Sequence, residues 1–195
     1  ARLSGILLDS VPMDDQGMAP EQLEQLCKRN KVHGIYTVGG IQNPTNYSMS
    51  EERRRAIAGI IEKYDLTLIE DDMYPFLSEN DQETLSQYVP DRSIYIASLS
   101  KAFYIGLRTT FVAAPRSLTA KISQAVVDSM WMVSPVSAEI ACRIITSGLG
   151  QEIIDKKKSQ LQDRVSMFRE RFVDQTFSVR NQSMFVWLKL PGQFQ

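Results

Sequence analysis

The sequence has few of the residues that build metal centres and disulfide frameworks. It contains one histidine, His33, and two cysteines, Cys27 and Cys142, which lie far apart along the chain. Such isolated cysteines predict reduced, buried side chains of a cytoplasmic protein. Because His33 has no ligand-like residues close to it in the sequence, we interpret it as structural and predict no metal site.

The chain also lacks long apolar runs and an excess of either charge. No segment approaches the roughly 20 apolar residues that cross a bilayer, and no signal peptide is recognisable. The net charge of -1 gives no bulk electrostatic attraction to nucleic acid or to an anionic membrane. With 43% hydrophobic and 23% charged residues, the composition is that of a globular protein.

Apolar runs and amphipathic segments alternate along the first part of the chain. Ser50 is a suitable helix N-cap, followed by acidic residues that favour a helix N-terminus. We expect strands at 5–11, 32–38, 66–69, 93–97 and 109–113, and helices at 20–30 and 50–64. This order predicts an α/β fold with a mostly parallel sheet and flanking helices. No helix joins the last two strands, so parallel order is expected to break there, and residues 77–91 are expected to form polar surface.

The last part of the chain has a mainly helical pattern. Helices are expected at 117–130, 137–147 and 151–172, followed by strands at 176–179 and 184–190. We therefore predict a large domain over residues 1–148. Residues 149–195 are expected to form a long helix and the beginning of a small α+β domain. The triplets Arg53–Arg55 and Lys156–Lys158 are interpreted as solvated helix faces.

One polar stretch lies between the strands expected at 93–97 and 109–113. It contains Lys101, preceded by Ser98 and Ser100 and followed by Arg108. A lysine partly shielded from water is a candidate nucleophile toward an aldehyde. Hydroxyl and guanidinium donors suit a phosphate. An aldehyde and a phosphate on one small molecule suggest pyridoxal phosphate (PLP), whereas this stretch alone also fits a loop lysine with Arg108 in a surface ion pair.

Two further polar clusters follow other expected strands. Asn43-Pro44-Thr45 comes after the run 34–38, and Asp71-Asp72-Met73-Tyr74 comes after the run 66–69. Open α/β sheets bind their ligands at the carboxyl ends of strands. Three clusters of complementary chemistry at such ends therefore predict a single site.

These three segments resemble the cofactor-binding motifs of fold-type I PLP enzymes, the aspartate aminotransferase superfamily. The family's Asn-Pro-Thr-Gly loop is similar to residues 43–46, its Asp-x-x-Tyr motif to residues 71–74, and its Ser-x-Ser-Lys and Gly-x-Arg motifs to residues 98–108. The resemblance covers almost the whole chain and implies the family's fold and its cofactor, PLP.

By position, the resemblance implies that Lys101 forms the Schiff base with PLP. Asp71 would pair with the pyridine nitrogen and keep the ring an electron sink. Asn43 and Tyr74 would hydrogen-bond the phenolic oxygen of the cofactor. Asp72 is the competing acid, but the spacing to the tyrosine favours Asp71, and we expect Asp72 to be a turn or capping residue.

The same resemblance implies that Ser98, together with Ser100, and Arg108 hold the phosphate. Two positions depart from the family pattern. Asn46 replaces a glycine, and asparagine tolerates the left-handed conformation that such a turn needs. Tyr104-Ile105 replaces a small residue and a proline, and these larger side chains are expected to crowd or reshape the pocket.

Residues near the middle and the end of the chain resemble one branch of this superfamily more closely. The segments 131–135, 138–140 and 187–191 are similar to those of MocR-type regulators of the GntR family, which join a winged helix-turn-helix to an aminotransferase-like domain that binds PLP. The resemblance implies a domain that senses PLP or an amino-acid ligand. Contact with DNA would be made only through an N-terminal winged-helix domain that this sequence lacks.

Two other functions stay open from the sequence. The chain also fits a fragment of a free-standing aminotransferase acting on aminoadipate-like or aromatic amino acids, or a degenerate fold that no longer binds PLP. Against the family, the upstream phosphate loop, the aromatic residue that stacks on the pyridine ring and the downstream carboxylate-binding arginine are missing. We therefore expect no full transamination by this chain alone, and a homodimer, because the family's sites usually form at a dimer interface.

Overall fold

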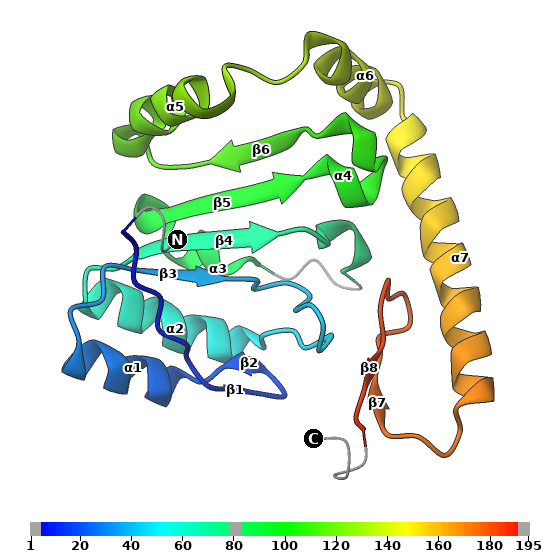
Figure 1. Ribbon diagram of the computed structural model, residues 1–195, viewed down its shortest axis with the longest axis horizontal. Helices are drawn as coiled ribbons and strands as arrows, with labels where there is room; N and C mark the ends of the chain where they lie inside the picture. Colours follow the sequence, from blue (N-terminus) through cyan, green and yellow to red (C-terminus); the bar gives the residue numbers. More distant parts are fainter. Residues whose placement is uncertain (1–4, 79–82, 191–195) are drawn as a thin grey trace.

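A four-stranded sheet forms the centre of the computed structural model, which describes residues 5–78 and 83–190 (Figure 1). The strands lie in the order β3 (Gly34–Thr37), β4 (Thr67–Asp72), β5 (Ser93–Ser98) and β6 (Thr110–Ala113). The first three run parallel, and β6 runs antiparallel to β5. The predicted α/β fold with a mostly parallel sheet is confirmed, including the break in parallel order at β5 and β6.

Three helices pack against one face of this sheet: α1 (Pro20–Arg29), α2 (Glu51–Lys63) and α3 (Leu85–Tyr88). Ser50 caps α2 as predicted, because its Oγ accepts a hydrogen bond from the backbone N–H of Arg53 at 3.2 Å. The main core lies between the helices and the sheet, where Ile57, Ile61 and Leu68 are fully buried.

Residues of β4 alternate between the two faces, as the geometry of a strand requires. Leu68, Glu70 and Asp72 are buried on the helix side, whereas Thr67, Ile69 and Asp71 lie on the opposite face and are only half-buried. That opposite face is open in the described residues: Tyr36 of β3 and all four residues of β6 are exposed. Polar side chains at the end of β4 are therefore divided between a covered face and an open one.

Three further helices follow the edge strand β6, and in Figure 1 they lie beside that strand and past the carboxyl ends of the parallel strands. They are α5 (Arg116–Met130), α6 (Pro135–Thr146) and α7 (Leu149–Arg171). In Figure 1, α7 runs past the carboxyl ends of the strands, and the hairpin of β7 (Phe177–Ser178) and β8 (Trp187–Leu188) lies between α7 and the sheet.

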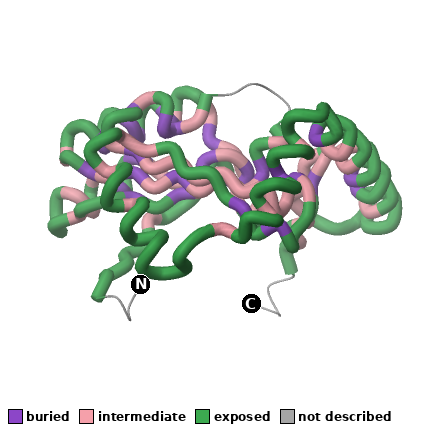
Figure 2. Tube along the Cα trace, turned by 90° about the horizontal axis from the view of Figure 1, so that it is seen from above, coloured by how far each residue is buried: buried purple, intermediate pink, exposed green. Residues whose placement is uncertain are grey.

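A second apolar cluster joins these parts. It contains Ile41, Tyr74, Leu77 and Leu161, with Phe185 packed against them. Figure 2 shows buried positions both in the layer of the sheet and beside the long helix. This second cluster anchors α7 and the hairpin to the loops that follow β3 and β4.

The N-terminal segment differs from the prediction. Residues 6–12 form no strand, and Leu7 and Leu8 are 92% and 74% exposed. A strand is stable only beside partners that satisfy its backbone groups, and none of the described residues pairs with this segment. A short antiparallel pair follows instead, β1 (Met13–Asp14) and β2 (Gly17–Met18).

The prediction of a polar surface at 77–91 was wrong at Leu77, which is 2% exposed, and over residues 85–89, and residues 79–82 lie outside the described part of the chain. Leu85 and Val89 are 0% and 3% exposed and join the main core through α3. Their spacing of four residues places them on one face of a helical turn.

Cys142 is exposed rather than buried, and both cysteines are free.

The two basic triplets are not uniformly solvated. Successive residues of a helix point about 100° apart, so three in a row cannot all face water on a packed helix. The Arg54 side chain is 3% exposed on the sheet side of α2, and Lys157 is half-buried on α7. The interpretation as solvated faces is wrong for these two middle residues.

Within residues 5–78 and 83–190, no helix is long and apolar enough to span a membrane.

Candidate cofactor site

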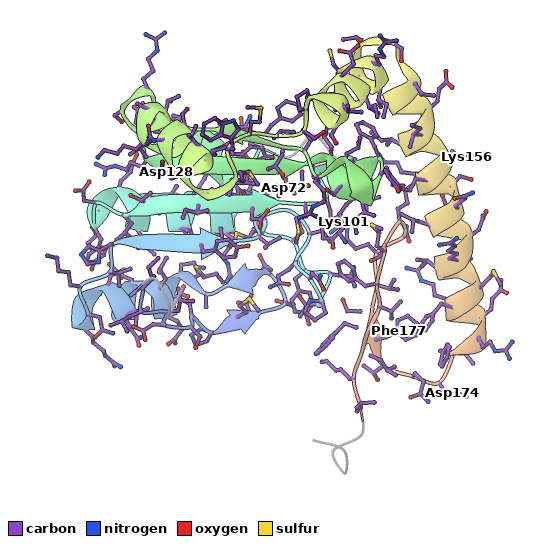
Figure 3. The ribbon with its side chains drawn as sticks, turned by 45° about the horizontal axis from the view of Figure 1, so that its top comes forward. Asp72, Lys101, Asp128, Lys156, Asp174 and Phe177 are labelled. Carbon is purple, nitrogen blue, oxygen red and sulfur yellow. The ribbon has the colours of Figure 1, made fainter. Side chains whose placement is uncertain are left out.

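The three polar clusters lie at or just beyond the carboxyl ends of β3, β4 and β5, and Figure 3 labels Asp72 and Lys101 of two of them. The loop with Asn43 follows β3, Asp71 lies near the end of β4, and Ser98 is the last residue of β5. Lys101 follows in the short helix α4 (Leu99–Ala102). One difference from the prediction is that β4 continues through both aspartates, which are strand residues rather than loop residues.

Asp71 lies on the open face of the sheet beside a tyrosine that the sequence analysis did not identify. The hydroxyl of Tyr36 donates a hydrogen bond to Asp71 Oδ2 at 2.7 Å. This bond, with burial and the negative charge of Asp71, raises the pKa of Tyr36 to about 12. Tyr36 therefore stays protonated and holds the carboxylate in place. The signal for Tyr36 was its position, on the open face of a strand near the carboxyl end.

Asp72 lies on the opposite, helix-covered face. It is 4% exposed, and its Oδ2 accepts a hydrogen bond from the hydroxyl of Tyr95 at 3.1 Å. Burial raises the pKa of this carboxyl above its ordinary value, against the effect of the hydrogen bonds and of Arg54. With Arg54, Glu70 and Tyr95 it lines a cavity of about 150 Å³ behind the sheet. Asp72 is thus a strand residue of the interior, and its predicted role in a turn or cap was wrong.

Asn43 and Tyr74 are brought together by the loops after β3 and β4. Tyr74 is 4% exposed, and its ring packs edge-on against Phe185 with 5.5 Å between centroids. Burial raises the pKa of Tyr74, while a side-chain hydrogen bond with Asn43 opposes that change. The peptide bond between Asn43 and Pro44 is cis. The phenol and the exposed amide form the adjacent pair of groups that the sequence predicted.

Asn46 adopts the left-handed conformation, with φ of 64°, as predicted for the residue that replaces glycine. Its Nδ2 also donates to the carbonyl oxygens of Ser178 and Phe185, each at 3.2 Å. The substitution therefore keeps the turn and adds polar contacts between this loop and the β7–β8 hairpin.

The stretch around Lys101 is a helical turn followed by an irregular segment. Ser98 caps α4, because its Oγ accepts from the backbone N–H of Ser100 at 3.3 Å. Its hydroxyl proton is still available for donation. Lys101 is half-buried, and its ammonium makes no hydrogen bond or ion pair within the described part of the chain. Arg108 is exposed and left-handed, with φ of 49°, after the turn η4 (Ile105–Leu107).

The two large residues before Gly106 lie in solvent rather than against the neighbouring clusters. Tyr104 and Ile105 are 66% and 59% exposed. A Cβ added at Gly106 would lie 2.3 Å from Cε1 of Tyr104, so the tyrosine ring covers this residue. A larger residue at position 106 would require this exposed ring to move.

The donor set fits the cofactor that the sequence predicts. A carboxylate, a phenol beside an amide, a serine hydroxyl, a guanidinium and a primary amine all lie along one edge of the sheet. These groups match a pyridine nitrogen, a phenolic oxygen, a phosphate and an aldehyde. The fold and this edge together define an α/β protein of the PLP-dependent transferase class.

The family comparison agrees with that class. Residues 1–194 match the family model described as aminotransferase class I and II, and the chain belongs to that family. Over 193 residues, covering 99% of this chain, it is 35% identical to a Bacillus subtilis protein named uncharacterized HTH-type transcriptional regulator YdeF. Over 127 residues, covering 58% of this chain and 30% of the relative, it is 35% identical to the rat mitochondrial kynurenine/alpha-aminoadipate aminotransferase.

Solved structures show the same fold. An archaeal alanine:glyoxylate aminotransferase superposes with a TM-score of 0.82 and 28% identity, over 94% of this chain and 49% of that one. A kynurenine aminotransferase from Pyrococcus horikoshii, solved in complex with PMP, gives a TM-score of 0.81 and 27% identity, over 93% of this chain and 48% of that one. The present chain spans 42% of the Bacillus regulator and about half of these enzymes.

Proposed function

We propose that this chain is the PLP-binding, aminotransferase-like domain of a transcription regulator, with an amino-acid ligand as its effector. One observation supports it most strongly: Lys101, Asp71 and the pair Asn43 and Tyr74 lie along one strand edge in the order of the family's motifs. Membership of the aminotransferase family supports the same cofactor.

In this proposal each group has one role toward PLP. Lys101 supplies the amine that captures the aldehyde, and Asp71, held by Tyr36, accepts from the pyridine nitrogen. Asn43 and Tyr74 donate to the phenolic oxygen. When bound, PLP supplies an electron sink for bonds to the carbon that carries an amino group.

Ser98, Ser100 and Arg108 bind the phosphate in this proposal. The hydroxyl of Ser98 donates, and the backbone N–H of Ser100 stays with Ser98 Oγ. Arg108 is the only cation of this stretch besides Lys101 and balances the phosphate charge. The left-handed backbone at Arg108 turns the chain directly after η4.

The regulator is preferred because of the identity that its relative keeps over the whole chain. The Bacillus subtilis protein named HTH-type transcriptional regulator YdeF matches 99% of the chain at 35% identity, whereas the bovine kynurenine/alpha-aminoadipate aminotransferase matches 96% of it at 27% identity. We further propose the division into residues 1–148 and 149–195, a homodimer, and DNA contact through a winged-helix domain outside this sequence.

A catalyst is the second candidate. The rat kynurenine/alpha-aminoadipate aminotransferase is as similar in identity, 35%, over a shorter stretch. Incubation of the PLP-loaded protein with amino acids distinguishes the two functions. Release of a keto acid over repeated turnovers would favour the enzyme, and a reversible spectral change without turnover would favour the sensor.

Cofactor binding is tested by mixing the protein with PLP, reducing with borohydride and locating the adduct by peptide mass. We expect the pyridoxyl group on Lys101 and its loss in Lys101→Ala, with Lys156→Ala as the control. An adduct that persists at another lysine in Lys101→Ala would contradict the assignment.

A further inference from the structure

The long helix α7 places a lysine directly against the turn that carries Lys101. Lys157 Nζ donates to the backbone carbonyl oxygens of Lys101 at 2.7 Å and Ala102 at 2.6 Å, and lies 3.5 Å from that of Phe103. About two turns earlier on α7, Gly150 packs on Phe103, since an added Cβ would lie 3.1 Å from its ring. Helix α7 therefore contacts this turn at two points on one face.

The carbonyls that Lys157 contacts are those a helix leaves unsatisfied. The α4 helix has only four residues, and the last carbonyls of a helix have no partner within it. A cation is favoured at that end by the alignment of the peptide dipoles. Lys157 satisfies three such carbonyls with one ammonium, which also lies 5.7 Å from the centre of the Phe76 ring.

Lys157 occupies a position on α7 at which an apolar residue would be expected. Gly150, Leu161 and Val165 are the buried residues of this helix, and Lys157 lies on the same face. Burial lowers the pKa of its ammonium, and no carboxylate among the described residues forms an ion pair with it. The three carbonyls are therefore the groups that compensate for removing this charge from water. Lys156, by contrast, points away from the sheet (Figure 3) and is exposed.

We propose that Lys157 is a positioning residue for Lys101: it fixes the peptide groups 101–103 and so sets where the Lys101 amine is presented. This rests on the proposed function of Lys101 as the residue that captures PLP. Lys157 itself touches only the backbone of the turn.

The same contact couples the Lys101 turn to the hairpin. One turn beyond Lys157, Leu161 packs in the cluster that contains Tyr74 and has Phe185 of the hairpin against it. A shift of α7 relative to the sheet would therefore move the Lys101 turn and the Tyr74 side of the site together. An effector that moves the hairpin would reach Lys101 through this helix.

The test uses the protein as its gene encodes it, with three variants. Lys157→Met keeps the length of the side chain but removes the donors, Lys157→Arg restores a cation, and Lys156→Met is the matched control on the outer face. Without PLP, hydrogen exchange of the backbone amides of residues 99–107 is measured. With PLP, the dissociation constant and the pH midpoint of the absorbance change of the bound cofactor are measured.

We expect exchange in 99–107 to be about tenfold faster in Lys157→Met, because three charge-assisted hydrogen bonds are lost. The dissociation constant for PLP should rise about tenfold, and the pH midpoint of the absorbance change of the bound cofactor should move. Lys157→Arg should return both the exchange rate and the PLP affinity most of the way to the wild-type values, and Lys156→Met should match the wild type. The proposal would be overturned if residues 99–107 exchanged as slowly in Lys157→Met as in the wild type. It would also be overturned if Lys156→Met and Lys157→Met had equal effects. If even the wild type failed to bind PLP, the proposed function would be wrong, and Lys157 could have no positioning role in PLP binding. The exchange data would still show whether Lys157 orders the turn.

Discussion

At the scale of single residues, two adjacent aspartates have different surroundings because a strand alternates its faces. Asp71 lies on the open face with Tyr36, and Asp72 is buried on the helix side with Tyr95. The spacing to Tyr74 favoured Asp71 as the cofactor ligand, which agrees with its place on the open face, but the sequence did not show that β4 runs through both acids. The face on which each aspartate lies is set by the register of β4 with β3 and β5, and a single sequence does not reveal that register.

The first residue-scale prediction compares these two acids in PLP binding. We expect Asp71→Asn to weaken PLP affinity roughly tenfold or more, because the charge that pairs with the pyridine nitrogen is removed. Asp72→Asn should change it by less than about threefold, since Asp72 faces away from the site. Fluorescence or absorbance titration with PLP measures both. The reverse ranking would mean that the ligand acid is Asp72.

The second residue-scale prediction concerns pH and the stability of the fold. Burial raises the pKa of Asp72 in the folded protein, so the folded state binds this proton more tightly than the unfolded chain does. Asp72 therefore lowers stability progressively as pH rises from its ordinary pKa, about 4, to its raised pKa, and the loss is about 1.4 kcal/mol for each pH unit between the two. Urea unfolding of wild type and Asp72→Asn between pH 4 and 8 should show the variant gaining relative stability as pH rises. A constant difference across this range would contradict the raised pKa.

At the scale of elements, a carboxylate inside the sheet layer holds a helix that the sequence pattern did not reveal. Glu70 of β4 is 1% exposed and accepts from the backbone N–H groups of Leu85 and Ser86, at 3.0 and 2.7 Å, and from the Ser86 hydroxyl at 2.6 Å. A carboxylate at a helix N-terminus is favoured by the orphan amides and the dipole. The helix α3 is only one turn long, too short for hydrophobic periodicity to identify.

Replacing Glu70 tests how far this contact stabilises α3. We expect Glu70→Gln to lower the free energy of unfolding by about 1.5 to 3 kcal/mol, because charge-assisted bonds in a buried setting are lost. Glu62→Gln, on the exposed side of α2, is the control and should change it by less than about 0.5 kcal/mol. Chemical denaturation monitored by circular dichroism measures both variants. If Glu70→Gln and Glu62→Gln had equal free energies of unfolding, α3 would be held by its apolar contacts alone.

The longer elements were predictable because their patterns are long. The amphipathic repeats identified α1, α2, α5, α6 and α7, and Gly148, with φ of 82°, follows the end of α6. The segment 5–11 failed for a different reason. Its residues are apolar enough for a strand, but strand formation depends on a partner, and partners are a property of the whole chain. Lys157 was missed because a triplet of lysines indicates a surface, while only the packing of α7 decides which one turns inward.

At the scale of the whole molecule, exposed apolar side chains gather where α5 meets α6. We call this the Trp131 patch, which consists of Met130, Trp131, Met132, Val136 and Ile140, each at least 45% exposed. Trp131 sits in a tight turn with φ of 67° and ψ of -66°, closed by a hydrogen bond from Met132 N–H to the Met130 carbonyl at 2.8 Å. Such a turn is rare and strained, and it places a large indole in solvent. Aromatic and methionine side chains are enriched in protein interfaces.

The Trp131 patch is the surface we expect the proposed homodimer to use. A group of exposed apolar side chains at a strained turn is typical of an interaction site, and a net charge of -1 does not oppose self-association. Sedimentation velocity should give a dimer at micromolar concentration. Trp131→Ser should weaken dimerisation roughly tenfold or more, because a central tryptophan often dominates binding energy. Met167→Ser removes an equally exposed apolar side chain from the outer part of α7 and should leave the dimer intact. A wild-type monomer at all concentrations would refute the homodimer, and a dimer that Trp131→Ser does not weaken would place its interface elsewhere.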